Sequence, residues 1–188
     1  MVHAHQQPLP PPVLEEISEG IYSYVQPDGT WFINNCGFVV APDQVVVIDT
    51  TSTEARTKAF IDAIRSVTDR PVLTVVNTHH HGDHTHGNYL FDRATVVAHR
   101  KCREVMMGAG RIVDYSAAFP GVAWGDLQFR APSLVFDGTL DLCVGDLTLT
   151  LSDLGHVAHT TGDVFGWIAA RGVLFSGDLV FHGGTPFV

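Results

Sequence analysis

The sequence has few basic residues and no long apolar run. Only 11 of its 188 residues are Lys or Arg, against 20 Asp or Glu, which gives a formal net charge of -9. A nucleic-acid surface needs a basic stripe, so nuclease activity and nucleic-acid partners are disfavoured. No segment approaches the roughly 18 apolar residues that span a bilayer, and the N-terminus lacks the basic and then apolar order of a signal peptide. The sequence therefore predicts a cytoplasmic protein without a membrane partner.

Cysteine is also scarce. Cys36, Cys102 and Cys143 are odd in number and widely spaced, and none belongs to a Cys-x-x-Cys pair. This usage excludes a disulfide framework and a cysteine-based zinc site. We expect three reduced thiols with structural roles in the core.

The length and the 45% hydrophobic content predict one globular domain. Residues 1–12 are rich in proline and are expected to form a mobile lead-in. The domain is then expected to cover residues 13–188.

The hydrophobic pattern predicts strands with helices between them. Two strand pairs are expected over residues 14–25 and 31–48. A helix is expected over 52–67, where Thr51 and Glu54 form a capping box, followed by a buried strand at 72–76.

The second half of the chain predicts further short elements. They are a strand at 95–98, a helix at 101–107, a long loop at 108–132 that could cover a site, a β-meander over 134–151 and a hairpin over 164–175. Strands dominate and helices lie among them, so we expect an α+β fold in which helices cover the outer faces of the sheets.

A histidine cluster follows the predicted strand 72–76. It contains His79, His81, Asp83 and His84, and six of the eleven histidines lie between His79 and His99. Imidazole and carboxylate groups suit zinc, iron or manganese, and the spacing His-x-His-x-Asp-His suits two metals. A solvated loop or an affinity tag would not produce this pattern after a buried strand. The remaining histidines of the run, His80 and His86, are expected to be bystanders.

Two later segments could supply further ligands. Residues 155–163 form a loop between strands that contains His156 and His159. Asp178 follows a buried strand and a glycine, a position from which a carboxylate could reach two metals.

Together these segments resemble the metallo-β-lactamase fold superfamily. The resemblance rests on Asp49 at the end of an early strand, the run His79 to His84, the run His159-Thr160-Thr161-Gly162, and Gly177-Asp178. It implies an αβ/βα sandwich with His79, His81 and His159 on a first metal, Asp83 and His84 on a second, and Asp178 bridging them. Asp49 would orient the ligand loop, although an ordinary acid near a helix N-terminus explains it equally well.

The resemblance also implies a reaction. Two zinc ions, or iron or manganese, would hold a bridging hydroxide that attacks an ester, thioester, lactone or amide carbonyl of a small-molecule substrate. Asp83 would hold and orient this nucleophile. The segment 106–129 and Trp31 are candidate walls of the substrate pocket.

Several alternatives stay open. Stretches such as Asn35-Cys36-Gly37 and Asn77-Thr78-His79 look most like a branch that includes aromatic polyketide cyclase/thioesterases. Asp178 stands where several true β-lactamases carry Cys or Ser, so antibiotic hydrolysis is a weaker alternative. A single-iron persulfide dioxygenase and an inert binding module are the others.

The sequence departs from the family pattern at its C-terminal end. Family members continue with a second αβ half and a final histidine on the second metal. We therefore expect a C-terminally incomplete domain, consisting of the N-terminal half and the start of the second half. Such a chain is expected to bind about one metal tightly, to show little activity alone, and to form a homo-oligomer through its exposed sheet edge.

Overall fold

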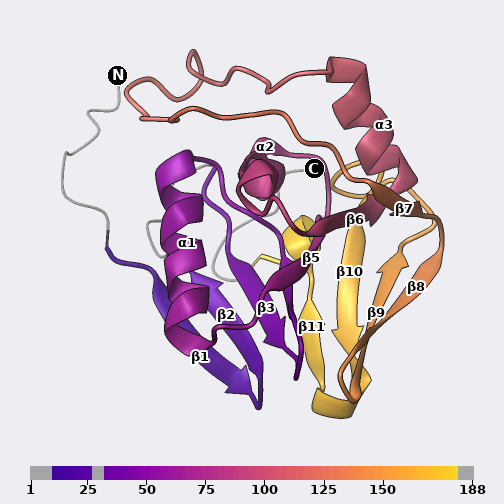
Figure 1. Cartoon of the computed structure of the whole chain (residues 1–188). Helices are drawn as coiled ribbons and strands as arrows, with labels where there is room; N and C mark the ends of the chain where they lie inside the picture. The colour runs from indigo at the N-terminus through magenta and orange to yellow at the C-terminus, as the bar shows by residue number, and fades with distance from the viewer. Residues whose placement is uncertain (1–9, 27–31, 182–188) are drawn as a thin grey trace.

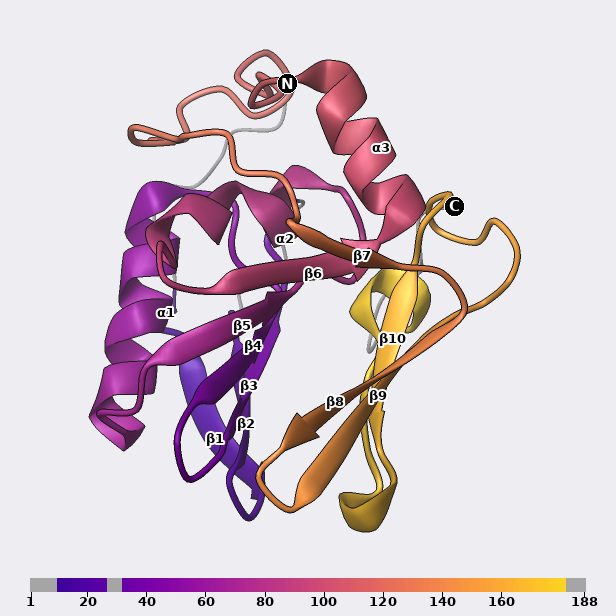
Figure 2. The same ribbon diagram turned by 45° about the vertical axis from the view of Figure 1, so that its right-hand side comes forward.

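The computed structural model of the chain describes residues 10–26 and 32–181. Two β-sheets face each other, one of seven strands in the order β1-β2-β3-β4-β5-β6-β7 and one of four strands in the order β11-β10-β9-β8. Figures 1 and 2 show the two sheets converging in a wedge, with α1 on the outer side of the larger sheet.

The larger sheet is antiparallel in its first half and parallel in its second half. Its strands are β1 (Val13–Ser18), β2 (Ile21–Val25), β3 (Cys36–Val40), β4 (Val45–Ile48), β5 (Val72–Val76), β6 (Thr95–His99) and β7 (Leu134–Phe136). The strands from β4 to β7 run parallel because helices and loops connect them as crossovers. Their carboxyl ends therefore meet at one edge of the sheet, where the histidine run begins.

The smaller sheet is antiparallel throughout. It contains β8 (Thr139–Val144), β9 (Leu147–Asp153), β10 (Val164–Ile168) and β11 (Val173–Phe175). The helical segments of the described chain are α1 (Glu54–Val67), α2 (Gly82–Thr85), η1 (His86–Leu90), α3 (Arg100–Ala109), η2 (Ala169–Arg171) and η3 (Gly177–Leu179). Within the described residues, no helix is long and apolar enough to cross a membrane.

The main core lies between the two sheets. Leu149 and Leu151 of β9 are completely or almost completely buried against Val39, Val46 and Val76 of the larger sheet. Their strand alternates buried leucines with outward-facing threonines, so one face of the smaller sheet is apolar.

A second core lies between the larger sheet and α1. Phe60 and Ile64 of this helix pack on Phe38, Val47 and Val75. Burying a side chain of this size stabilises the fold by about 1.5–3 kcal/mol. The two cores hold the sheet rigidly from both sides, which fixes the backbone at its carboxyl edge.

The α+β prediction is confirmed, but the expected β-meander over 134–151 is wrong. β7 pairs in parallel with β6 of the larger sheet, and only β8 and β9 form a hairpin. The residues of β7 are too few to show by their pattern which sheet they join. Helices also cover only one of the two sheets in the described part of the chain, because no described helix lies on the outer face of the smaller sheet.

Two local predictions need correction. The N-cap of α1 is Thr53, whose hydroxyl accepts a hydrogen bond from Arg56 N, so Thr51 and Glu54 do not form a capping box. Cys143 faces outward on β8 and is exposed, whereas Cys36 and Cys102 are buried as expected. The alternation of β8 places every second residue toward solvent, and Cys143 has that parity.

The element boundaries agree within a few residues elsewhere. The helix predicted over 101–107 extends over Arg100–Ala109, and the strand predicted over 31–40 begins only at Cys36. The loop predicted over 108–132 is irregular from Gly110 onward. Trp31 lies outside the described residues, as does most of the expected lead-in.

Candidate metal centre

The candidate centre lies where β4 and β5 end at the carboxyl edge of the larger sheet. The chain leaves β5 at Val76, turns through His79 and His81, and enters the short helix α2 at Gly82. A Cβ added at Gly82 would lie 2.3 Å from Nε2 of His86, so a larger residue would fit only if the His86 ring moved. The histidine run therefore folds as a turn followed by one helical turn, and not as a simple loop.

Three imidazoles converge on one point. His81 Nδ1 lies 3.1 Å from His79 Nε2 and 3.0 Å from His159 Nε2. Two nitrogens on one tetrahedral zinc, each about 2.0–2.1 Å from the ion, would stand roughly 3.3 Å apart. The three nitrogens therefore already stand close to the spacing that one ion requires.

Two of these imidazoles, His79 and His81, are held in the neutral form that binds metal. Burial lowers the pKa of His79 well below its usual value, and the neighbouring His84, His81 and His159 lower it further. Burial is also the main cause that lowers the pKa of His81 to about 4. At neutral pH both side chains keep a free lone pair for a cation.

A second group surrounds Nε2 of His84. This nitrogen lies 3.2 Å from Oδ1 of Asp178 and 3.6 Å from Oδ2 of Asp83. It is buried, and among the described residues it has no partner with hydrogen-bond geometry. Burial alone would lower the pKa of His84, but the carboxylates of Asp49, Asp83 and Asp178 raise it well above its usual value. The position thus favours a positive charge, whether a proton or a metal ion.

Asp178 stands between the two groups. Its Oδ2 lies 3.5 Å from His159 Nε2 and 4.0 Å from His79 Nε2, while Oδ1 faces His84. Although burial raises the pKa of Asp178, the nearby His84, His159 and His81 lower it below the usual range. Asp178 lies in η3, directly after the edge strand β11, so the smaller sheet positions its carboxylate at the centre.

Asp49 fixes the orientation of two of the histidines. Its Oδ2 accepts hydrogen bonds from His84 Nδ1 at 2.9 Å and from the hydroxyl of Thr78 at 2.8 Å. Because this hydroxyl donates to Asp49, it accepts from Nδ1–H of His79 at 3.0 Å. Both histidines therefore present Nε2 to the centre.

The backbone of Asp49 supports this positioning role. Asp49 is buried and adopts the left-handed conformation (φ 61°), which costs a non-glycine residue about 1–3 kcal/mol. Its Oδ1 accepts the backbone N–H of Thr78 at 2.7 Å, so it also fixes the start of the ligand turn.

The loop between β9 and β10 places only one of its two histidines at the centre. His159 reaches His81, whereas His156 is exposed. The loop is held after His159 by Asp163, whose carboxylate accepts hydrogen bonds from Thr160 N at 2.7 Å and from the Thr160 hydroxyl at 2.6 Å. This turn explains why a threonine follows His159.

The sequence interpretation missed a buried amide pair that closes the ligand turn. Asn77 and Asn88 exchange two hydrogen bonds of 3.0 and 2.8 Å, and both side chains are completely buried. Asn77 also donates to the carbonyl oxygen of His84. The signal available in the sequence was their placement on either side of the histidine run.

The two expected bystanders point away from the imidazole group. His86 Nδ1 donates to the carbonyl oxygen of Ser52 at 3.1 Å. His80 is half-buried, and it lines a cavity on the side of the turn that faces α3. Of the predicted pocket wall over 106–129, Met106, Ile112, Tyr115 and Phe129 line the same cavity.

Comparisons with known proteins identify the family. Residues 29–188 match the family model described as the metallo-beta-lactamase superfamily. The acyl-coenzyme A thioesterases MBLAC2 of Bos taurus and Homo sapiens are each 32% identical over 124 residues, which is 61% of this chain and 43% of theirs. The chain thus spans less than half the length of these relatives.

Solved structures agree on the fold. The metallo-beta-lactamase from Pontibacter korlensis superposes with a TM-score of 0.72 at 18% identity, covering 93% of this chain and 74% of that chain. TMB-1 superposes with a TM-score of 0.70 at 21% identity, covering 94% and 74%. Because the family model spans most of the sequence and these structures share its architecture, the chain belongs to the metallo-beta-lactamase superfamily.

Proposed function

We propose that the chain is the metal-binding part of a dinuclear, zinc-type hydrolase. The observation that carries this proposal is the shared position of Asp178 between two groups of potential ligands. One group is His79, His81 and His159, and the other contains His79, His84 and Asp178, with Asp83 beside it. In this proposal Asp83 and His84 hold the second ion and Asp178 bridges both ions.

The donor set fits zinc. Three imidazoles suit a tetrahedral zinc ion, and carboxylates with imidazole suit a second divalent ion. The buried Nε2 of His84, which has no well-oriented partner in the described chain, is the atom that an ion would satisfy. Iron and manganese accept the same donor atoms, so the metal has to be identified by experiment.

The residues around the centre also provide what hydrolysis needs. Two bound zinc ions would activate a water molecule and polarise a carbonyl group. Asp83 is buried, and burial raises the pKa of its carboxyl above the usual value. In the proposed reaction this carboxylate accepts a hydrogen bond from the attacking water and orients it.

A thioester is the substrate class that we propose first. The two curated relatives are acyl-coenzyme A thioesterases. Esters, lactones and amides present the same carbonyl chemistry and are the next candidates. The formal charge of -9 disfavours a nucleic-acid substrate.

A combined measurement of metal content and hydrolysis tests the proposal. The purified protein is loaded with zinc, iron or manganese separately, and each form is assayed on a panel of acyl thioesters, aryl esters and lactones. We expect hydrolysis that requires zinc and is lost after chelation. Activity only with iron together with oxygen consumption would contradict the proposal, and so would zinc binding at the centre with no hydrolysis of any substrate in the panel.

A further inference from the structure

His99 is buried at the junction between the larger sheet and α3. It is the last residue of β6 and the N-cap of α3, and its Nδ1 accepts a hydrogen bond from Lys101 N at 3.2 Å. When one ring nitrogen of a neutral imidazole accepts a hydrogen bond, the other nitrogen carries the proton. Nε2 of His99 therefore carries the proton and can donate it to a second partner.

The second partner is Asp153, the last residue of β9 in the smaller sheet. Nε2 of His99 lies 3.0 Å from Oδ2 of Asp153. The same carboxylate accepts hydrogen bonds from Gly138 N and Gly155 N, each at 2.7 Å. The bond from Gly138, more than the contact with His99, lowers the pKa of Asp153 below its usual value, so this group is a carboxylate at neutral pH. His99 thus connects the end of a strand in one sheet to the end of a strand in the other.

Asp153 precedes the loop over residues 154–163, which carries His159, and His99 also contacts the far end of that loop. A Cβ added at Gly162 would lie 3.2 Å from Nδ1 of His99 and 2.7 Å from a backbone nitrogen in the first turn of α3. Figures 1 and 2 show the N-terminal end of α3 beside the loop that joins β9 to β10. His99 therefore contacts the residues at both ends of this loop.

The first part of the loop has little protein around it. Residues 154–157 are exposed, and the hydrogen bonds between Thr160 and Asp163 fix the chain only after His159. Nε2 of His159 nevertheless lies 3.0 Å from Nδ1 of His81. The position of this imidazole therefore depends on how the two ends of the loop are held.

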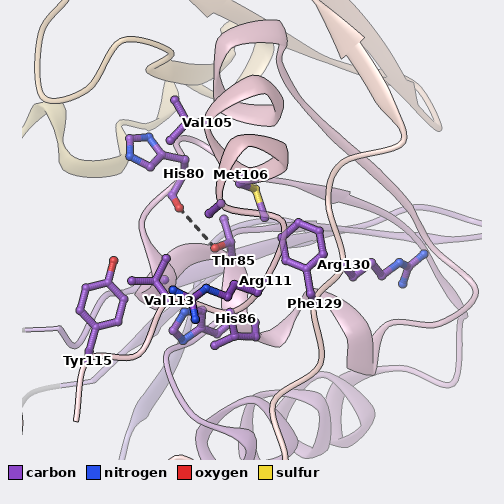
Figure 3. A pocket seen from close by; sticks show the side chains of 13 residues that line it. His80, Thr85, His86, Val105, Met106, Arg111, Val113, Tyr115, Phe129 and Arg130 are labelled. Atoms are coloured by element: carbon purple, nitrogen blue, oxygen red, sulfur yellow. Dashed lines mark hydrogen bonds between the residues drawn. The ribbon is translucent and has the colours of Figure 1, made fainter. Parts of the chain in front are cut away.

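The contacts of His99 are separate from the other contacts of α3. Val105 and Met106, further along the helix, line the cavity shown in Figure 3, and His99 does not line it. The neighbouring Arg100 forms an exposed ion pair of 2.8 Å with Asp137, which lies between β7 and β8 and not in the loop that carries His159. Oδ1 of Asp137 lies 3.7 Å from His99 Nε2, farther than the carboxylate at the end of β9.

From these contacts we infer that His99 is a positioning residue, which holds the β9–β10 loop so that His159 reaches the other imidazoles of the candidate centre. This inference rests on the proposed function for the role of His159 as a metal ligand. His99 acts through His159 and does not itself contact an ion.

Two substitutions separate the two contacts of His99. The Oδ1 atom of asparagine is as many bonds from Cα as Nδ1 of histidine, so His99→Asn keeps an N-cap acceptor but does not reach Asp153. The Nε2 atom of glutamine is as many bonds from Cα as Nε2 of histidine, so His99→Gln keeps a donor for Asp153 and loses the cap. Arg100→Gln removes the exposed ion pair with Asp137 and is the matched control.

Hydrogen exchange of the metal-free protein measures the hold on the loop. The amides of Ala158 and Thr160, on either side of His159, both donate hydrogen bonds within the loop. In His99→Asn their exchange should be about tenfold faster, because a hydrogen bond to a charged group no longer opposes local opening. Exchange should stay close to the parent rate in His99→Gln and Arg100→Gln, and the amides of β4 and β5 should not change in any variant. Unchanged exchange at Ala158 and Thr160 in His99→Asn overturns the inference.

Titration with cobalt(II), followed by its visible absorption, shows whether the effect passes through His159. His99→Asn should weaken the binding of the first cobalt ion about tenfold, and Arg100→Gln should not weaken it. In a His159→Ala background, His99→Asn should cause no further loss, because two changes that act through one side chain are not additive. A merely structural role would weaken binding by the same factor in both backgrounds, and that result overturns the inference.

The two measurements distinguish failure of this inference from failure of the proposed function. Equal losses in the two backgrounds overturn the role of His99 and leave the metal centre intact. A parent protein that binds neither cobalt nor zinc overturns the proposed function. Exchange at Ala158 and Thr160 then decides the inference by itself, because His159 already approaches His81 without a metal.

Discussion

The two carboxylate oxygens of Asp178 face different histidines: Oδ1 lies 3.2 Å from His84 Nε2, and Oδ2 lies 3.5 Å from His159 Nε2. The histidines come from different sheets, because His84 follows β5 and His159 lies between β9 and β10. The contact of the two sheets therefore assembles the candidate centre. A change that separates the sheets would separate the two groups of ligands.

The shared position of Asp178 predicts the outcome of its removal. Asp178→Ala should remove most of the second metal and nearly all hydrolysis, because both ions lose a ligand at once. The fold should remain, since Asp178 lies on a partly exposed turn. Metal per chain is measured by inductively coupled plasma mass spectrometry.

A good control is Asp146→Ala. Asp146 also follows a glycine with positive φ, but it lies at the β8–β9 turn. Full metal stoichiometry in Asp178→Ala would show that Asp178 is only a turn residue.

The two histidines of the β9–β10 loop should behave differently. His159→Ala removes one of three converging imidazoles and should abolish tight binding of the first metal. His156→Ala should leave metal affinity unchanged because His156 is exposed. Competition with a chromogenic chelator measures both affinities, and a larger loss in His156→Ala would reverse the ligand assignment.

Asp49 should affect metal binding without touching the metals. Asp49→Asn removes the charge that stabilises the proton on His84 Nδ1 and the acceptor of the Thr78 hydroxyl. Loss of such a partner lowers metal affinity by about 10–100-fold. Asp43→Asn, at an exposed turn, serves as the matched control, and equal affinities in the two variants would mean that Asp49 does not orient the ligands.

The metal-free protein should become less stable as the pH falls from about 6.5 to about 4. The pKa of His81 is lowered from 6.5 to about 4, and the pKa of His79 is also lowered well below its usual value, mainly by burial. Between these pH values the unfolded chain binds protons that the folded chain does not, so the free energy of unfolding decreases. His84 acts in the opposite direction, because its raised pKa gives stability that is present below 6.5 and lost only as the pH rises through the raised value.

Urea unfolding at pH 6.5 and pH 4.5 measures this dependence. His81→Asn should reduce the loss of stability, and the exposed control His156→Asn should leave it unchanged. A midpoint that does not fall in the parent protein would show that these imidazoles are not buried in neutral form.

The sequence indicated which residues lie together at the candidate centre better than it indicated how the fold holds them. The spacing within one run depends on local geometry, so His79, His81 and His84 could be proposed as ligands from a run that follows a buried strand. The parallel pairing of β7 with β6 and the Asn77–Asn88 pair depend on contacts between distant segments. A three-residue strand and two asparagines carry no pattern that reveals such contacts. The N-cap was misplaced because Thr51, Ser52 and Thr53 are all good capping residues.

Anomalous diffraction at the zinc edge from crystals grown at saturating zinc tests the central claim most directly. We expect one zinc peak on His79, His81 and His159, and a second, less occupied peak on Asp83 and His84, roughly 3.5–4 Å away. Asp178 should lie between the two peaks with one oxygen toward each. A single peak that Asp178 does not contact, or a first peak bound by His156 in place of His159, would contradict the proposed dinuclear centre.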